Sequence, residues 1–248
     1  MEEFSRTERL LGKEGMAKLK NAGILVFGAG GVGSHCIDAL ARSGVGCLFI
    51  IDHDTVAVSN INRQSIAFHH TVGRKKTEVI REQILDIHPD CRVFTSDAFI
   101  LPENLEEIME QARASMGKFP DYIIDAIDTV SAKLALAEYA YTHCIPLISS
   151  MGTGNKLHPE KFMFADIYQT SVCPLCRVMR RELKKRGVPS LEVLYSEEVP
   201  LTPQFTEEFT KEEQKNASGR PVPGSISFVP PAAGLMIAGK VIRQICGC

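Results

Sequence analysis

The sequence has no long uncharged apolar run and no apolar leader. No apolar stretch of about 18 residues is free of charge, and the C-terminal segment 230–245 is interrupted by Lys240 and Arg243. Met1-Glu2-Glu3 offers neither the positive start nor the apolar core of a signal peptide. We therefore expect a cytoplasmic protein without integral membrane association.

The chain also lacks internal repeats, low-complexity tracts and a strong charge of either sign. A formal net charge of −2 neither requires nor excludes a nucleic-acid partner, because such binding depends on the local distribution of charge. The 8 cysteines are scattered over expected helices, strands and loops, unlike the regular framework of a disulfide-rich secreted domain. This scatter suits a reducing compartment.

Expected strands alternate with expected helices in the first 155 residues. Strands are expected at 24–27, 47–51, 92–95, 122–127 and 145–149, and helices after residue 33 and at 74–87, 103–114 and 130–142. This alternation predicts an α/β fold with a doubly wound, Rossmann-like, mostly parallel sheet. Ligands of such sheets bind at the carboxyl ends of the strands.

The remaining segment, 156–248, is expected to add antiparallel and helical elements to the same single domain. Further strands are expected at 162–168 and 191–195, and helices at 174–186 and 230–245. The polar segment 200–224 shows no apolar periodicity, which predicts a mobile crossover loop or partial disorder. We interpret 1–155 as the nucleotide-binding part and 156–248 as the substrate-recognition and dimerisation part.

A glycine-rich turn follows the first expected strand. The run Gly28-Ala29-Gly30-Gly31-Val32-Gly33 matches GxGxxG, in which the first glycine allows a tight turn, the second a close approach of phosphate, and the third close helix packing. Asp52 ends the second expected strand, where an acid usually accepts hydrogen bonds from ribose hydroxyls. The pattern predicts a nucleotide site, and NAD-dependent dehydrogenases share it.

Polar residues after Asp52 argue against hydride transfer. Asn60, Arg63 and Lys76 offer one amide and two cations, a set that suits a triphosphate better than a dinucleotide pyrophosphate. Asp54 is placed to hold Mg²⁺ against phosphate oxygens, or it merely caps the turn. Each of these side chains alone would more often be a solvated surface residue, so the prediction of an ATP site depends on their combination.

Residues 24–76 resemble the ThiF/MoeB-like family of E1-like, ubiquitin-activating adenylating enzymes. The resemblance implies that Asp52 binds the ribose of ATP, and that Asn60, Arg63 and Lys76 contact its phosphates above the glycine turn. It also implies a Mg²⁺ ligand at Asp128 or Asp54. The candidate nucleotide-binding residues are Gly28, Gly30, Gly31, Gly33, Asp52, Asp54, Asn60, Arg63, Lys76 and Asp128.

The same resemblance implies a homodimer. In the family, an arginine from the N-terminal helix of one subunit reaches the γ-phosphate in its partner, and Arg9 is the candidate here, with Arg6 the less favoured choice. The candidate catalytic residues are therefore Arg9, Arg63, Lys76 and Asp128.

Basic residues recur at helical spacing in the expected helix 174–186. Leu175, Met179 and Leu183 fall on the opposite face. A cationic face of this kind would bind a phosphate backbone through counterion release, and the alternative is an ordinary solvated helix face. The candidate nucleic-acid-binding residues are Arg177, Arg180, Arg181, Lys184 and Lys185.

The second half resembles one branch of the family, the tRNA threonylcarbamoyladenosine dehydratases. The resemblance is carried by residues 173–175, 180–187, 195–198 and 224–230. It implies ATP-dependent cyclisation of N6-threonylcarbamoyladenosine at position 37 of tRNA, through an acyl-adenylate. The alternatives are adenylation of the C-terminus of a ubiquitin-like sulfur carrier and a non-catalytic nucleotide sensor. A cysteine desulfurase or sulfur-acceptor partner stays open.

Four cysteines near the C-terminal half have spacings found in metal sites. Cys173 and Cys176 form a CxxC pair, and Cys246 and Cys248 would complete four thiolate ligands for a tetrahedral zinc ion. The alternative, which we favour, is a buried Cys173 at a helix start and an unpaired C-terminus.

Overall fold

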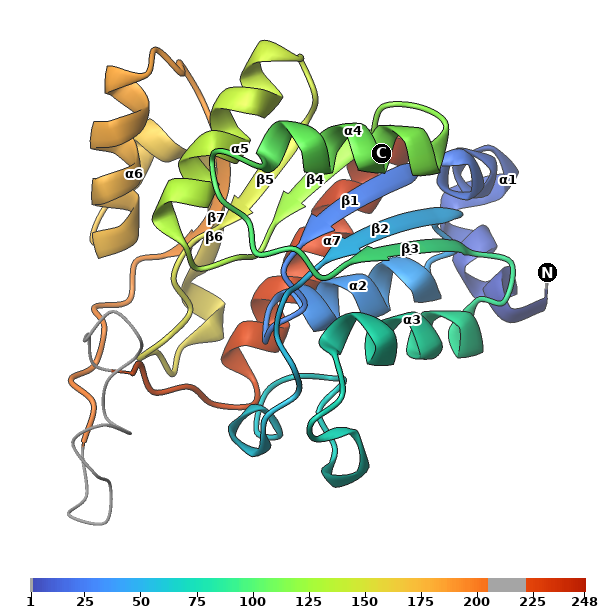
Figure 1. The fold of residues 1–248 in the computed structure, drawn as a ribbon, viewed down its shortest axis with the longest axis horizontal. Helices are drawn as coiled ribbons and strands as arrows, with labels where there is room; N and C mark the ends of the chain where they lie inside the picture. The colour runs from blue at the N-terminus through green and yellow to red at the C-terminus, as the bar shows by residue number, and fades with distance from the viewer. Residues whose placement is uncertain (1, 205–221) are drawn as a thin grey trace.

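A computed structural model describes residues 2–204 and 222–248, arranged around one seven-stranded sheet (Figure 1). The strand order is β3-β2-β1-β4-β5-β7-β6. All neighbours pair in parallel except β6 and β7. The strands are β1 Gly23–Phe27, β2 Cys47–Ile51, β3 Arg92–Ser96, β4 Tyr122–Asp125, β5 Leu147–Ser150, β6 Phe162–Asp166 and β7 Glu192–Ser196. The predicted fold class is confirmed.

Helices cover both faces of the sheet. They are α1 Ser5–Asn21, α2 Gly33–Arg42, α3 Lys76–Ile87, α4 Leu105–Met116, α5 Val130–Thr142, α6 Pro174–Lys185 and α7 Val229–Cys246. Side chains of β1 alternate between two cores: Ile24 and Val26 contact the side of α1, α2, α3 and α7, whereas Leu25 and Phe27 contact the side of α4 and α5. Coverage on both faces explains why all of β1 is buried and apolar.

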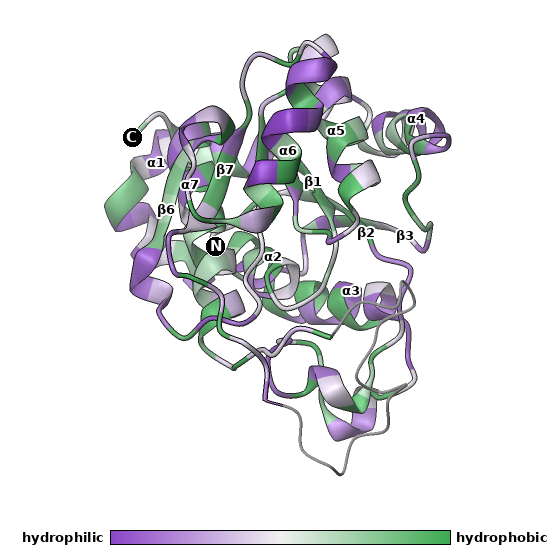
Figure 2. Cartoon of the chain, turned by 90° about the vertical axis from the view of Figure 1, so that its left-hand side faces the viewer, coloured by the Kyte–Doolittle hydropathy of each residue, from purple (hydrophilic) through white to green (hydrophobic). Residues whose placement is uncertain are grey.

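A third, smaller core joins α6 to α5. Met179 and Leu183 of α6 are fully buried there, next to Leu134 and Ala137 of α5. Figure 2 shows hydrophilic and hydrophobic residues alternating along α6, as the sequence predicts for an amphipathic helix. No helix in the described ranges is long and apolar enough to cross a membrane.

Several element boundaries differ from the sequence prediction by one or two residues. Helix α3 begins at Lys76 rather than 74, because Lys75 forms a β-bridge with Thr55. Strand β4 ends at Asp125, which leaves Asp128 on the turn before α5. Strand β6 ends at Asp166, whose carboxylate accepts a hydrogen bond from the Tyr168 amide and turns the chain. The predicted loop 200–224 lies mostly outside the described residues, since 205–221 are not among them.

Candidate functional site

A cavity of about 410 Å³ opens at the carboxyl ends of the parallel strands, within the usual size range of small-ligand sites. Its wall brings together nearly all of the predicted nucleotide residues: Gly28, Gly30, Gly31, Asp52, Asp54, Asn60, Arg63, Lys76 and Asp128. Gly33 lies just beneath it, at the first turn of α2.

A second cavity, of about 610 Å³, lies at the opposite edge of the sheet. It is the larger of the two, but it contains no glycine turn. Lys118, one of its cations, is already engaged by Asp121. The convergence of chemically suited groups, rather than size, identifies the smaller cavity as the candidate active site.

The glycine turn is fixed by close backbone contacts. Gly28 has φ +94°, and a Cβ there would lie 2.8 Å from the Ala126 carbonyl oxygen. A Cβ on Gly33 would lie 1.8 Å from the Gly28 carbonyl oxygen. Gly30 differs, because the nearest atom to a Cβ there would be Gln64 Nε2 at 4.0 Å. The turn therefore needs glycine at Gly28 and Gly33 for its shape, and leaves open space at Gly30 beside the N-terminus of α2, where anions are favoured.

Asp52 links the glycine turn to the end of β2. Its carboxylate accepts hydrogen bonds from the amides of Ala29 at 2.7 Å and Asp54 at 2.9 Å. The side chain is almost fully buried, and it lines the cavity. Each oxygen uses one protein donor and keeps further lone-pair capacity, which suits hydrogen bonds from ribose hydroxyls.

Lys76 places a buried cation in the cavity. Its Nζ donates to Asp54 Oδ2 at 2.7 Å and lies 3.8 Å from Asp52 Oδ1, while only 4% of the residue is exposed. Lys76 is also the first residue of α3. The two carboxylates keep the ammonium group oriented where phosphate oxygens would arrive.

Arg63 and Asn60 come from the segment after β2. The half-buried Arg63 donates from Nη1 to the Ser59 carbonyl at 2.8 Å and to Asn62 Oδ1 at 2.9 Å. Burial lowers the pKa of Arg63, yet a guanidinium stays charged in proteins. Asn60 Oδ1 accepts the Ala57 amide at 3.1 Å. These contacts leave the rest of the Arg63 fork available to a ligand.

Asp128 is an exposed carboxylate on the cavity wall. Within the described residues it accepts no hydrogen bond and forms no ion pair. The turn that carries it is supported by a buried network that sequence reasoning missed: Lys133 Nζ donates to both Asp125 oxygens at 3.0 Å and to the Ser150 carbonyl at 2.7 Å. The sequence pattern that could have indicated this network is an acid at the end of a strand, Asp125, followed eight residues later by a lysine on the next helix, Lys133.

Other wall residues were also missed. Ala98, Phe99 and Ile100 follow β3 and form an apolar side next to Asp52, suited to a flat base. Gln64 is buried, and no described residue offers its Oε1 a hydrogen bond. An unpartnered polar atom in a cavity is costly unless a ligand or water satisfies it.

The residues fit a magnesium–nucleotide complex at Asp128 better than at Asp54. In the part of the chain that the structure describes, Asp52, His53 and Asp54 form the one group of His, Cys, Asp or Glu close enough to share a metal ion, with ligand atoms within 4.8 Å. However, Lys76 already neutralises Asp54. Asp128 lines the same cavity, and no cation of residues 2–204 or 222–248 forms an ion pair with it.

The structure contradicts the possibility, raised from the sequence, that four cysteines form a zinc site. Cys173 and Cys176 are buried in the α5–α6 core, whereas Cys246 lies near the end of α7, where its Sγ is 3.7 Å from the Gly15 carbonyl oxygen of α1. Figure 1 shows the C-terminus on the side of α1, away from α6. Cys246 therefore packs against α1 and not beside the CxxC pair.

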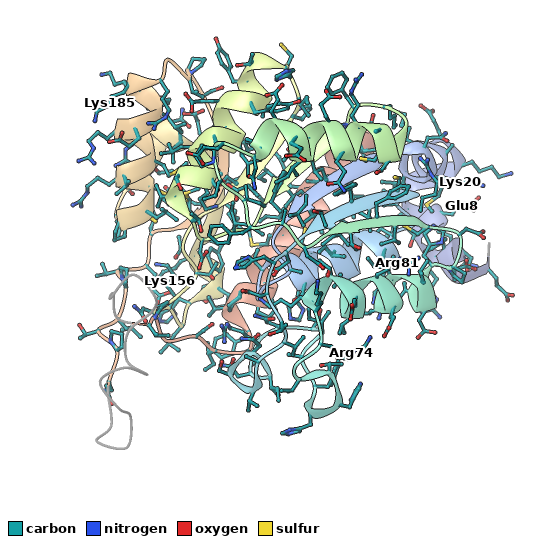
Figure 3. All side chains as sticks on the ribbon, viewed as in Figure 1. Glu8, Lys20, Arg74, Arg81, Lys156 and Lys185 are labelled. Atoms are coloured by element: carbon teal, nitrogen blue, oxygen red, sulfur yellow. The ribbon has the colours of Figure 1, made fainter. Side chains whose placement is uncertain are left out.

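Arg9 does not line the cavity of its own chain. It is exposed on α1, at the edge of the sheet opposite the carboxyl ends of the strands, where Figure 3 labels its neighbour Glu8. Gly12, with φ +69°, interrupts α1 three residues later. Arg9 is therefore not placed to contact a nucleotide in the cavity of its own chain.

The basic face of α6 is smaller than predicted. Arg180 is half-buried and donates to the Thr170 carbonyl at 2.8 Å. The prediction that Arg180 lies on the exposed basic face is therefore wrong. Glu182 pairs with Arg181 and Lys185 and has its pKa lowered to about 2 by them. Among the described residues, Arg177 and Lys184 are exposed without an ion pair. Figure 3 shows Lys185 at the outer end of the helix.

A family model described as ThiF family matches residues 4–248. The chain belongs to the ThiF family. It is 38% identical to the tRNA threonylcarbamoyladenosine dehydratase of Bacillus subtilis (strain 168), over 99% of this chain and 95% of that protein. It is 37% identical to the enzyme of the same name from Escherichia coli (strain K12), over 81% of this chain and 75% of that protein.

A solved structure supports the similarity to the tRNA threonylcarbamoyladenosine dehydratases. The crystal structure of E. coli tRNA N6-threonylcarbamoyladenosine dehydratase, TcdA, in complex with ATP superposes with a TM-score of 0.84 at 31% identity, covering 99% of this chain and 94% of that chain. The resemblance inferred from the sequence is therefore confirmed along nearly the whole chain.

Proposed function

We propose that this ThiF-family chain uses ATP to cyclise N6-threonylcarbamoyladenosine in tRNA, with loss of water. The observation that supports the proposal is the single cavity in which a glycine turn, two cations and the exposed carboxylate of Asp128 converge. Relatives that match the chain over nearly its full length carry the name of this activity.

The reaction has two steps. A carboxylate oxygen of the threonylcarbamoyl group attacks the α-phosphorus of ATP, the bond to pyrophosphate breaks, and an acyl-adenylate forms. The ureido group then attacks the activated carbonyl carbon, and AMP leaves with the former carboxylate oxygen. Because the second step is intramolecular, correct positioning supplies most of what it needs, and no enzyme nucleophile is required.

Residues of the cavity have separate roles in this scheme. Asp52 binds the ribose, and the apolar side formed by Ala98, Phe99 and Ile100 holds the adenine. Arg63 and Lys76 stabilise negative charge that develops on the phosphates in a partly buried site, where such charges act strongly. Asp128 would hold Mg²⁺, which neutralises phosphate charge when bound.

Helix α6 connects the cavity to a surface for tRNA. Leu175, in its first turn, lines the cavity, and the exposed Arg177 and Lys184 lie further along the same helix. A phosphate backbone held by these cations would leave a nearby unpaired base within reach of the cavity mouth. Single-stranded loops are the usual targets of base-specific RNA recognition.

A homodimer would complete the site. Arg9 lies outside the cavity of its own chain and is exposed, so it can act only on the nucleotide of a second copy. A two-fold arrangement would place one Arg9 at each of two equivalent sites.

Pyrophosphate release tests this proposal against its main alternative, adenylation of a Gly-Gly-terminated sulfur carrier. We expect release with ATP and threonylcarbamoyl-modified tRNA, and none with the same tRNA lacking the modification. Release that depends on the carrier and ignores the tRNA would contradict the proposal.

A further inference from the structure

Asn155 holds a short segment against the wall of the cavity. Its backbone N–H donates to the Gly224 carbonyl at 2.8 Å, and its side-chain Oδ1 accepts a hydrogen bond from the Gly224 backbone N–H at 2.6 Å. Its own carbonyl accepts the Leu201 amide at 2.8 Å. One residue therefore fixes two points of the chain, one shortly after β7 and one shortly before α7.

The backbone of Asn155 is adapted to this task. Its φ is +58°, a region that L-residues avoid and that Asn tolerates better than most. The preceding Gly154 is pressed against Pro223, since a Cβ on Gly154 would lie 2.8 Å from Pro223 Cβ. A residue in an uncommon conformation persists only where its surroundings repay the cost.

A second asparagine holds the same segment from the other side. Asn62 Nδ2 donates to the Ser225 carbonyl at 3.1 Å, and Asn62 Oδ1 accepts from Arg63 Nη1 at 2.9 Å. Pro223, Gly224 and Ser225 are thus fixed between the turn after β5 and the segment that presents Arg63. We call residues 223–225 the wall segment.

The wall segment lies at one end of the cavity. In the order of the sheet, Ala98 and Ile100 follow the edge strand β3, at the end that we assign to adenosine. The glycine turn follows the central strand β1, and Gly152 and Gly154 follow β5 on its other side. Gly152, Gly154, Leu175 and the wall segment complete the lining. Leu175 begins the helix whose basic face continues outward, so this end is where a substrate held by α6 would enter.

We propose that Asn155 is a positioning residue for the acyl acceptor: with Asn62 it holds the wall segment so that the carboxylate-bearing substrate is placed beside the α-phosphate. This inference rests on the proposed function and goes beyond it, because it assigns one end of the cavity to the acceptor. It places Asn155 outside the contacts made with ATP.

Three substitutions at Asn155 separate its backbone from its side chain. Asn155→Gly permits the positive φ and removes the bond from Oδ1. Asn155→Asp keeps an acceptor oxygen and tolerates the same φ. Asn155→Ala loses both features. If the side-chain bond matters, Asn155→Gly and Asn155→Ala should lower kcat/KM for modified tRNA by roughly tenfold, and Asn155→Asp should recover most of the activity.

Two further measurements exclude a merely structural role. The Kd for ATP should stay within about twofold of wild type in all three variants, because Asn155 is not one of the residues that line the cavity. Hydrogen–deuterium exchange of a peptide containing Gly224 should speed up in Asn155→Gly and not in Asn155→Asp. By contrast, Asn62→Ala should weaken ATP binding as well, because Asn62 also supports Arg63.

Each outcome has a consequence. If hydrogen–deuterium exchange at Gly224 is unchanged in Asn155→Gly, the Asn155 side chain does not hold the wall segment, whatever the substrate. Faster exchange with unchanged kcat/KM would overturn the positioning role. If wild type fails to act on modified tRNA, the proposed function fails, and the same variants are then scored by ATP–pyrophosphate exchange with the Gly-Gly carrier, where the acceptor role predicts the same order of activities.

Discussion

At the scale of single residues, the glycines of the turn are not equivalent. Gly33 has its hydrogen facing the Gly28 carbonyl oxygen, whereas Gly30 faces open space in the cavity. The motif identified both positions from the sequence, but it could not distinguish a glycine needed for the fold from one needed for a ligand. The space around each Cα in the structure distinguishes the two cases.

Substitution of each glycine by alanine should separate these two needs. Gly33→Ala should destabilise the protein by about 1–3 kcal/mol or more, because an added methyl group overlaps backbone that cannot move freely. Gly30→Ala should retain near-normal stability and lose affinity for ATP. Denaturant unfolding and ATP titration measure the two effects. Equal stability losses would contradict the assignment.

Cys173 provides a pH-dependent prediction. A hydrogen bond from the Cys176 thiol lowers the pKa of Cys173, as do amides of the first turn of α6, while the pKa of Cys176 is raised. A thiolate whose folded pKa is lowered stabilises the fold above the ordinary thiol pKa of about 8.5, and this contribution is lost as the pH falls through the lower folded pKa.

Thermal unfolding of wild type and Cys173→Ser over this pH range tests the effect. The stability of wild type relative to the variant should decline as the pH is lowered from about 9, because the variant lacks this titration. A difference in Tm that does not change with pH would show that Cys173 remains a neutral thiol in the folded protein.

At the scale of elements, apolar runs located the central strands because those strands are buried on both faces. Contacts between distant segments could not be predicted in this way. The Thr55–Lys75 bridge delays the start of α3, and Thr170 draws Arg180 away from the exposed face of α6. Helix α7 packs against α1 and so places Cys246 beside α1. The spacing of the cysteines in the sequence does not reveal this contact.

The buried pair of Lys133 and Asp125 ties α5 to the ends of β4 and β5. Lys133→Met should cost about 3–5 kcal/mol of unfolding free energy, because it leaves a buried carboxylate without its partner. Lys118→Met is a matched control, since its pair with Asp121 is exposed and should cost less than about 1 kcal/mol. Denaturant unfolding of both variants measures the two losses of unfolding free energy. Similar losses would show that the buried Lys133–Asp125 pair stabilises the fold no more than the exposed pair does.

The prediction about tRNA concerns Arg177 and Lys184, the two α6 cations for which the described part of the chain offers no ion-pair partner. Arg177→Glu with Lys184→Glu should weaken tRNA binding with ATP affinity unchanged. The slope of log Kd against log salt concentration should fall by roughly one for each phosphate that the protein no longer neutralises. Lys20→Glu with Arg81→Glu makes the same change in net charge on the side of the molecule away from α6 (Figure 3). Equal effects of both double variants would remove α6 from the tRNA surface.

At the scale of the whole molecule, the position of the site follows from the topology. Parallel strands bring Gly28, Asp52 and Asp128 to one edge of the sheet, so the glycine motif and the alternation of elements were enough to place them together. The wall segment could not be predicted, because it returns to the site from a distant part of the chain and is held by side chains with no sequence signature. The role of Arg9 depends on a second copy of the chain.

Mixed dimers test that role. Arg9→Ala and Asp128→Ala should each be inactive, and mixing them should restore activity, because a hybrid dimer contains one site with both residues intact. Random exchange predicts recovery of about a quarter of wild-type activity. Arg6→Ala serves as the neighbouring control and should stay active. Absence of any recovery in verified hybrid dimers would rule out action in trans.

The most direct test of the whole account is mass spectrometry of nucleosides from threonylcarbamoyl-modified tRNA, after incubation with the protein, ATP and Mg²⁺ under mild conditions that preserve a labile ring. The account predicts conversion of N6-threonylcarbamoyladenosine to a product lighter by one water, dependent on ATP and lost in Lys76→Ala. Unchanged modified adenosine, with pyrophosphate exchange appearing only when a Gly-Gly-terminated carrier is supplied, would contradict it.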